Sequence, residues 1–578
     1  PEPVASVDLL SGALPARVGD RLSGVVDIRT RNGGRDRVRG NGSVGLISSR
    51  AGVDGPLPGG RGSFLFSARR TYLDLFTDAA HALGIAQYTV PYAFTDGHLK
   101  LTHEVGRHGS LAASAYVDEE RLRVPESMDI SEKIDWAWGS RAASLSYRQP
   151  FASTFLAEFR VALSSFYGSF QVEPRRDESA PVAPPMRTLD ARTSIRDVLA
   201  GADLAWYHGA HQVRAGVQVD AYLFDYDVAV TGSDWSDYFP AFTRTDRPRS
   251  VATYVEDEWA AGPLRLRAGA RVLHGSGMGT EWMPRLGARL SLSPTLALSL
   301  GAGRYAQALF SLKDEESIFS SLMAYDFLAP VPPSAGLSTG EDLVAGAEWS
   351  AGATSVRADA YVKRATRVPL APLAAEPLHS PVIVPHGTQT TTGRSRGIEV
   401  LARHEWERGG VTLAYALAHA DRVVDGERFA PRFDRRSRLD VMGFTGMGKR
   451  GQASARVVWG TGQPYTPAVG RIEGNRYDPL AGGLVPNIPV SETTVFGDHN
   501  SARLPGYFRV DLGIRGCLER EWFGRVTTLT PYLQVLNAFN SRNVLFAEAD
   551  PFGKGQRPEL EFAPQLPFLP TFGIEWRF

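Results

Sequence analysis

Apolar and polar residues alternate one by one along many short stretches of this chain. From Phe508 to Arg515 every second residue is apolar, and Arg, Asp or Gly fills the positions between. The same period runs through residues 213–220, 264–271 and 356–362. Successive side chains of a strand point to opposite faces, so this pattern predicts strands with one apolar and one polar face. Counted from residue 37 onward, the pattern predicts 22 strands.

The connections between these stretches alternate in length. Short turns are expected near residues 106–109, 208–211 and 350–353, and long connections near 173–190, 307–340 and 462–503. Short turns at one rim and long loops at the other are typical of bacterial outer-membrane barrels. No run of 18 or more apolar residues is present, which excludes a transmembrane helix but not a spanning barrel. We therefore predict an all-β protein with a 22-stranded antiparallel transmembrane β-barrel.

The last nine residues form the clearest of these strands. Phe572, Ile574, Trp576 and Phe578 share one face, and the chain stops on that face. The stretch resembles the closing strand of an outer-membrane β-barrel. That resemblance implies that Phe578 is an assembly signal read by the barrel-assembly machinery, and that Phe578 lies at the periplasmic rim with the short turns.

Composition and motifs narrow the chemistry. The chain has 63 basic and 63 acidic residues, so nothing in its charge indicates nucleic acid. Its single cysteine, Cys517, excludes an intramolecular disulfide framework. No metalloprotease, nucleophile-elbow, phosphate-loop or dinucleotide motif occurs, so we expect no enzyme activity and no cofactor. The histidines are scattered, and the acidic run at 314–316 is read either as a Ca²⁺ site or as a solvated loop charge.

Residues 1–36 do not follow the barrel pattern. Residues 14–28 read Leu-Pro-Ala-Arg-Val-Gly-Asp-Arg-Leu-Ser-Gly-Val-Val-Asp-Ile, a turn followed by a short strand. This stretch resembles the end of the plug domain of TonB-dependent outer-membrane receptors, from which it departs at Val18 and Asp20. The resemblance implies two domains: residues 1–36 as the C-terminal end of the plug, and residues 37–578 as the barrel. It also implies that the rest of a plug, and a TonB-contacting box, would precede residue 1.

Later strings carry the same resemblance through the chain. They read Gly-Pro-Leu at 55–57, Ser-Ala-Arg-Arg-Thr-Tyr-Leu-Asp at 67–74, Gly-Arg-Ser-Arg-Gly-Ile-Glu-Val at 393–400, Phe-Asp-Arg-Arg-Ser at 433–437, Gly-Thr-Gly-Gln-Pro-Tyr-Thr at 460–466 and Gln-Val-Leu-Asn-Ala-Phe-Asn at 534–540. In the family, the Gly-Pro-Leu element marks the periplasmic turn after the second barrel strand.

The polar faces of the strands predict the charges of a wide lumen. We expect the following side chains to point inward and to hold a plug by reversible polar contacts: Arg265, Arg267, Arg357, Asp359, Glu399, Asp440, Arg509 and Asp511. The alternative is a ladder in which neighbouring strands pair Arg with Asp or Glu and only wet the wall. Because residues 1–36 are rich in Arg, we also expect them inside the lumen, paired with inward carboxylates such as Asp359, Glu399, Asp440 and Asp511. Their strand, near residues 25–28, needs a partner strand from sequence before residue 1 or from a second chain.

Aromatic residues in the long loops are the candidates for contact with a substrate. Asp234, Trp235, Asp237, Tyr238 and Phe239 stand together in one loop. Amphipathic aromatics suit organic ligands or glycans, and they equally suit the membrane-interface girdle. The same two alternatives apply to Trp136 and Trp138.

The resemblance implies energised, TonB-dependent uptake of a nutrient too large or too scarce for porins. The partners would be outer-membrane lipid, the barrel-assembly machinery and, if a box exists upstream, an inner-membrane TonB-type energy-coupling protein. The alternative is a structural or partner-binding barrel in a multi-chain envelope complex, with a separate plug, a lipoprotein lid or other subunits. The sequence does not identify the substrate.

Overall fold

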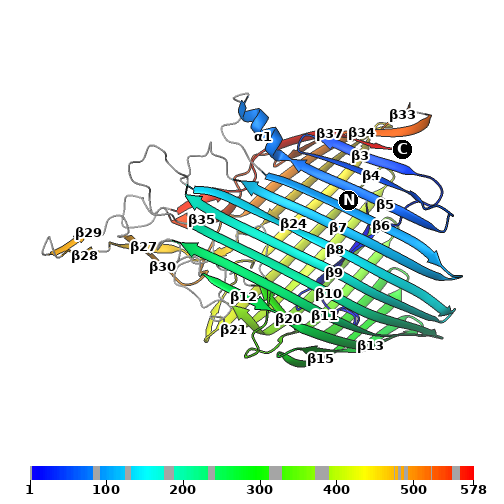
Figure 1. Ribbon diagram of the computed structural model, residues 1–578, viewed down its shortest axis with the longest axis horizontal. Coiled ribbons are helices and arrows are strands. Elements are labelled where there is room, and N and C mark those ends of the chain that lie inside the picture. The colour runs from blue at the N-terminus through cyan, green and yellow to red at the C-terminus, as the bar shows by residue number, and fades with distance from the viewer. Residues whose placement is uncertain are drawn as a thin grey trace.

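The computed structural model describes residues 3–82, 92–123, 132–174, 188–231, 241–311, 328–370, 389–473, 475–478, 483–486, 492–522, 524–549 and 560–578. Among these residues, 22 antiparallel strands close into one barrel (Figure 1). The fold class predicted from the alternating pattern is confirmed.

The wall strands follow one another around the barrel in chain order. They are β3 (Arg39–Gly45), β4 (Ser48–Pro56), β5 (Gly62–Tyr72), β6 (Tyr92–Val105), β7 (Gly109–Arg123), β8 (Glu132–Ala152), β9 (Phe155–Pro174), β10 (Thr188–His208), β11 (His211–Thr231), β13 (Arg249–Ala261), β14 (Leu264–Gly275), β15 (Gly279–Ser293), β16 (Leu296–Gln307), β19 (Ser338–Ala351), β20 (Thr354–Leu370), β21 (Gln389–Trp406), β22 (Gly409–Val424), β24 (Ser437–Met447), β25 (Gly451–Gly460), β32 (Tyr507–Gly516), β34 (Arg525–Leu536) and β37 (Leu569–Arg577). Three short strands extend the wall beside β11, β22 and β34: β12 (Phe242–Asp246), β23 (Glu427–Phe429) and β33 (Leu518–Trp522).

The long connections carry small elements of their own. They are α1 (Leu73–Ala82) and the strand pairs β17 (Leu309–Ser311) with β18 (Leu328–Pro330), β26 (Pro464–Tyr465) with β31 (Ala502–Arg503), β27 (Ala468–Glu473) with β30 (Glu492–Phe496), β28 (Asn475–Asp478) with β29 (Gly483–Pro486), and β35 (Val544–Ala549) with β36 (Leu560–Pro564). Figure 1 shows the β27–β30 and β28–β29 pairs beyond one rim of the barrel. None of the helices in the described residues is long and apolar enough to cross a membrane.

The barrel closes where its first strand meets its last. β3 pairs with β4 on one side and with β37 on the other, with Asn41 opposite Arg577 and Val44 opposite Ile574. Phe578 continues the ladder, because its N–H donates to the carbonyl of Gly40 at 2.9 Å. Closure leaves no unpaired edge, as a barrel in lipid requires.

The two rims differ as the connection lengths predict. β37 ends beside the start of β3, at the rim that also holds the short β4–β5, β10–β11 and β13–β14 turns. The N-terminal half of β37 leads back to the rim with the long connections (Figure 1). The prediction that the short turns lie at the Phe578 end is therefore confirmed, and that rim is the periplasmic one.

Wall residues divide between the two faces as the period of two dictates. Val217, Val255 and Ile514 are among the large apolar side chains exposed on the outside of the wall. Arg, Asp and Tyr side chains of the intervening positions face the lumen, where Arg285 and Tyr305 contact the N-terminal segment. The outer face is the lipid-facing surface of an integral outer-membrane protein.

The N-terminal segment forms a hairpin of its own. β1 (Val4–Leu10) pairs antiparallel with β2 (Val25–Thr30), with Val7 opposite Ile28 and Leu9 opposite Val26. The expectation that β2 pairs with sequence before residue 1 or with a second chain is wrong, because its partner strand comes from residues 4–10. β1 was not predicted, since a strand of seven residues before a turn carries little pattern of its own.

A second feature of the interior is a buried apolar cluster. Trp136 and Trp138 of β8, with Phe224 of β11, pack against the β17–β18 pair, including Phe310. The indole rings of Trp136 and Trp138 lie 5.5 Å apart, edge to face, and these residues are only 8% and 7% exposed. The connection between β16 and β19 thus folds back against the inner wall.

Candidate functional site

The candidate site is the region where the chain's own N-terminal segment meets the inner wall. Residues 11–24 connect β1 to β2, and we call them the anchor. They lie against inward side chains of β13 to β20. The anchor has no regular structure and contains three residues with positive φ, Gly12, Ala13 and Asp20. Its polar backbone groups must therefore find partners on the wall.

Arg285 of β15 donates hydrogen bonds to backbone carbonyls of the anchor. Its Nη1 atom lies 2.5 Å from the carbonyl oxygen of Pro15, and it also donates to the carbonyls of Leu14 and Val18. The guanidinium carbon lies 4.7 Å from the centroid of the Tyr305 ring. Arg285 is only 3% exposed. A buried cation is tolerated here because carbonyl dipoles and an aromatic face take the place of water.

Wall side chains also accept hydrogen bonds from the anchor's amides. The four bonds are Ala13 N to Asp342 Oδ2 at 3.1 Å, Leu14 N to Tyr305 Oη at 3.0 Å, Ala16 N to Glu256 Oε2 at 2.5 Å and Leu22 N to Gln307 Oε1 at 3.3 Å. Tyr305 in turn donates to Asp342 Oδ1 at 3.0 Å. On the carbonyl side, Arg267 Nη2 donates to Ala13 O at 2.5 Å. These wall side chains therefore bind the backbone of the anchor.

A single ion pair ties the far end of the anchor. Arg271 of β14 contacts Asp20 through Nη2 and Oδ2 at 2.5 Å, and Arg271 is 1% exposed. Gly19 precedes this pair, and a Cβ at Gly19 would come within 2.3 Å of Arg271 Nε. Glycine at position 19 is thus required for Arg271 to approach the backbone.

Close packing accompanies these polar contacts. A Cβ added to Gly301 of β16 would lie 2.2 Å from the Cβ of Ala13, and one added to Gly269 of β14 would lie 3.0 Å from the Cβ of Ala16. Real carbon atoms do not approach so closely, so the wall has room for the anchor only because it carries glycine at these points.

The chain leaving β2 makes a second set of contacts with the wall. Arg31 Nη2 lies 2.8 Å from Asp54 Oδ1, and the Asp54 side chain also accepts from Gly34 N at 2.7 Å. Arg35 pairs with Glu104. These partners differ from those predicted, because Asp54 and Glu104 stand on β4 and β6, next to the point where the chain enters the wall.

Five of the predicted wall residues lie beside the anchor. Arg267 contacts it directly, and a cavity of about 610 Å³ lies between the wall and residues 9–13. Arg265, Arg357, Asp359 and Glu399 line that cavity. Arg357 is paired with Asp359 at 2.7 Å, two residues along the same strand. The structure therefore brings this group together around the N-terminal segment.

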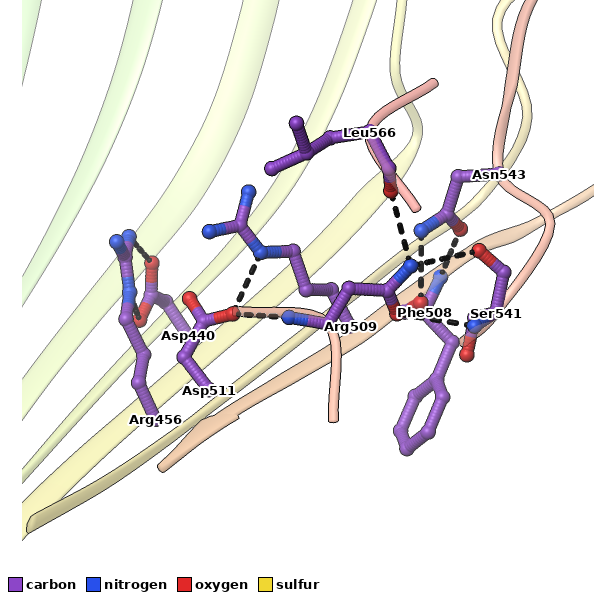
Figure 2. A network of polar contacts seen from close by, with 9 residues as sticks. Asp440, Arg456, Phe508, Arg509, Asp511, Ser541, Asn543 and Leu566 are labelled. Carbon is purple, nitrogen blue, oxygen red and sulfur yellow. Dashed lines mark hydrogen bonds and ion pairs between the residues drawn. The ribbon is translucent and has the colours of Figure 1, made fainter. Parts of the chain in front are cut away.

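The other three predicted wall residues lie elsewhere in the lumen. Asp440 pairs with Arg456 of the neighbouring strand at 2.5 Å, and Arg509 pairs with Asp511 at 2.7 Å (Figure 2). Both pairs join wall residues to each other, which agrees with the alternative of a charge ladder. Asp511 also accepts from Asn537 N at 2.9 Å.

Asn537, within the string at 534–540, and Asn543, three residues after it, bind backbone groups at the base of a loop. Asn537, at φ +50°, is fully buried, and its Nδ2 donates to the carbonyls of Ser541 at 3.1 Å and Leu566 at 3.0 Å. Asn543 bonds both backbone groups of Phe508 (Figure 2). These amides fix the loop base after β34 onto the start of β32.

Asp434, in the Phe-Asp-Arg-Arg-Ser string, has a comparable role. Its carboxylate lies 2.5 Å from Arg503 and 2.9 Å from Arg436, and it accepts from Ala420 N at 2.8 Å. The buried carboxylate ties the base of the long 461–506 connection to β22 and β24. The strings at 433–437 and 534–540 thus mark joints of the outer rim.

The loop candidates for substrate contact divide into two groups. Asp234, Trp235, Asp237, Tyr238 and Phe239 lie outside the described residues, as does the acidic run at 314–316. Trp136 and Trp138 lie inside the apolar cluster against β17–β18, so neither belongs to an outer aromatic girdle. Their period-two placement on the inner face of β8 is the physical reason.

Sequence reasoning missed the residues that hold the anchor most firmly. They are Glu256, Arg285, Tyr305 and Asp342, together with Arg271, which the alternation over 264–271 places only on the polar face. Each stands on the polar face of a wall strand, so alternation places it inward. Which inward residues meet the N-terminal segment depends on strand positions around the barrel, and no local pattern contains that information.

Comparison with known proteins identifies a matching family model and similar solved structures. The family model described as "TonB dependent receptor-like, beta-barrel" matches residues 59–529. Among solved structures, the chain is similar to Pseudomonas aeruginosa FpvA bound to heterologous pyoverdines (TM-score 0.67, 13% identity, 99% of this chain and 76% of that one). It is also similar to the siderophore receptor PirA from Acinetobacter baumannii (TM-score 0.65, 13% identity, 100% and 85%) and to the copper transporter OprC (TM-score 0.66, 13% identity, 99% and 85%). A search of curated protein sequences finds no match.

Proposed function

Because the chain belongs to the TonB-dependent receptor family, we propose that it imports a nutrient too large or too scarce for porins by energised transport. The family and the structural neighbours are transport receptors, not enzymes. The protein is integral to the outer membrane, and the family implies a TonB-type partner and outer-membrane lipid around the barrel.

The anchor is the observation that supports transport over an open pore. A simple pore has no use for a segment bound inside its lumen. Here buried charged groups of the wall, Glu256, Arg271 and Arg285, are all engaged with residues 14–20. Burying a charge is costly unless it is paired, so the wall is built around this segment. We propose that residues 1–36 are the C-terminal end of a plug domain and residues 37–578 the barrel.

The substrate proposal draws on the neighbours' descriptions. The matched structures are described as binding pyoverdine–iron, as a siderophore receptor and as a copper transporter. We propose a metal complex, with an iron-loaded siderophore as the first class to test. The loop residues Asp234, Trp235, Asp237, Tyr238 and Phe239 remain the proposed outer contacts, since aromatic and carboxylate groups together suit an organic chelate.

The test is uptake of labelled complexes by cells that produce the protein. A panel of iron-loaded siderophores and copper complexes is supplied to cells with and without a functional TonB-type protein. We expect one class to accumulate only when both proteins are present. Equal accumulation without the energy-coupling protein indicates a passive pore. If no complex binds the purified receptor, and deleting the receptor leaves uptake unchanged, metal-complex transport is rejected.

Loop variants test the contacts within the same assay. Trp235→Ala is expected to weaken binding of the identified complex by about tenfold, since truncating an interface aromatic often costs about 1–2 kcal/mol. Trp282→Ala is a control for loss of a tryptophan, because Trp282 is strongly exposed and stands on β15. Equal affinity of both variants would remove residue 235 from the proposed site.

Assembly is a separate proposal. We propose that Phe578 is the signal for the barrel-assembly machinery. Phe578 also continues the closing ladder, so deletion removes its backbone bonds with Gly40 at 2.9 and 3.2 Å. Deleting Phe578 is expected to lower the amount of barrel in outer membranes much more than the yield of refolding in detergent. An equal decrease in both would assign Phe578 to closure of the seam alone.

A further inference from the structure

The lipid-facing side of the wall carries a groove over β9, β10 and β11, three strands that run side by side (Figure 1). Its volume is about 390 Å³. Its floor is small because two outward positions of β10 are alanine, whereas the flanking strands carry larger side chains. The lining includes Ala200 and Ala202 on β10, Phe159 and Val161 on β9, and Val217 and Val219 on β11.

A polar cluster stands on the same face at the periplasmic rim. His208 and His211 lie opposite each other across the β10–β11 turn. The His208 ring stacks on Trp206 at 5.2 Å, and the His211 ring stacks on Trp259 at 6.1 Å. His211 Nδ1 lies 2.7 Å from Asp257 Oδ2. Two indoles, two imidazoles and one carboxylate thus form one continuous strip on the outside of the barrel.

Asp257 is the unusual member of this strip. It shares the outer face of β13 with Val255 and Trp259, where a carboxylate faces lipid. An ionisable group on such a face is costly unless a partner neutralises it. Oδ1 is shielded, whereas the side chain as a whole is 37% exposed, so Oδ2 is the oxygen that a ligand can reach. His211 occupies only one acceptor position of Oδ2, which leaves a second one for a cationic donor.

The distance between the groove and the strip matches the distance between the acyl chain and the headgroup of a lipid. From Ala202 to His208 the strand advances six residues, about 20 Å along its axis. At a strand tilt of about 45° this is about 14 Å of depth, close to half of a hydrocarbon core about 30 Å thick. A headgroup at the strip would place its acyl chain along the groove toward the bilayer midplane.

We propose that this face is a specific site for one phospholipid of the periplasmic leaflet, with a headgroup that carries a phosphate and a primary ammonium. The ammonium donates to Asp257 Oδ2. The phosphate accepts from His208 and from the indole N–H groups of Trp206 and Trp259, and one acyl chain occupies the groove. Phosphatidylethanolamine has this chemistry. Phosphatidylcholine keeps the phosphate but has no N–H to donate, and phosphatidylglycerol has no cation.

The barrel offers a matched rim position without the carboxylate. His404 stands beside Trp406 on β21, with ring centroids 6.1 Å apart, and its Nδ1 lies 2.8 Å from Thr354 Oγ1. The same ring types therefore meet a hydroxyl here instead of Asp257. This position should bind lipid without distinguishing the ammonium.

The experiment uses the full chain purified from membranes and exchanged into mixed micelles. Native mass spectrometry counts the lipids retained when equal amounts of phosphatidylethanolamine, phosphatidylcholine and phosphatidylglycerol are supplied. We expect one phosphatidylethanolamine retained at least about tenfold more strongly than phosphatidylcholine, the size expected for one hydrogen bond to a charged group. Asp257→Asn should abolish that preference, and His404→Gln should leave it unchanged.

A groove variant tests the acyl chain independently of the headgroup. Ala202→Phe fills the floor and is expected to reduce retention of all three lipids about equally. The proposal is overturned if the unmodified chain retains the three lipids alike, or if Asp257→Asn keeps the preference. Retention unaffected by Ala202→Phe would overturn the acyl-chain part. None of these results depends on what the receptor transports.

Discussion

Along β13 to β20 the most buried inward charges bond to residues 11–24, whereas along β24 to β32 the inward charges bond to one another. Arg271 and Arg285 are 1% and 3% exposed, and both contact the anchor. Arg456, paired with Asp440, keeps nearly half of its side chain exposed. The residue types on the two sides are the same, and the covering segment makes the difference.

That difference determines how much each charged side chain contributes to stability. Surface-like ion pairs contribute about 0–1 kcal/mol, because water and salt screen them. Removing one member of a buried group of hydrogen-bonded side chains leaves its partners unsatisfied and costs several kcal/mol. The anchored side should therefore be sensitive to single substitutions, and the side with wall pairs should be tolerant.

The largest effect is expected for Arg285→Met. Methionine keeps the bulk of the stem, but it leaves the carbonyls of Leu14, Pro15 and Val18 without their shared donor. We expect local release of the anchor to become easier by about 3 kcal/mol or more, which is more than a hundredfold in opening equilibrium. Hydrogen exchange at the Ala16 amide, which donates to Glu256, measures this. Unchanged exchange would show that the remaining contacts suffice.

A smaller effect is expected for Gly301→Ala. The added Cβ would lie 2.2 Å from the Cβ of Ala13, so the anchor or β16 has to move. Overpacking of this kind costs about 1–3 kcal/mol. Gly393→Ala is the control, because a Cβ there meets nothing closer than 4.0 Å. Faster Ala16 exchange in both variants would mean that glycine loss alone, and not the clash, loosens the segment.

The smallest effect is expected for Arg456→Ala on β25, in the part of the wall where the charges pair with one another. It breaks a half-exposed pair with Asp440, and we expect the unfolding free energy to fall by no more than about 1 kcal/mol. Raising the salt concentration should shrink even this loss. Ala16 exchange should not change. A loss of several kcal/mol, or faster exchange at the anchor, would contradict the distinction between the two sides.

Particular residues show how far the sequence could lead. The period of two placed Arg265, Arg267 and Asp359 on the inner face, and the structure has them beside the cavity along residues 9–13. The same period placed Asp440 inward, yet its partner, Arg456, comes from a register that only the assembled sheet defines. The partner of β2 was missed because hairpin pairing across residues 11–24 leaves no signal within either strand.

The sequence by itself determined the strands, the two faces, the alternation of short and long connections and the closing strand at Phe578. These are local properties, because side-chain direction and turn length depend on neighbouring residues alone. Only the tertiary structure decided that Arg285 of β15 and Glu256 of β13 clamp one turn of the N-terminal segment, and that Asp257 and His211 meet on the lipid face. Such contacts join residues far apart in the chain, and they exist only once closure has fixed the position of every strand.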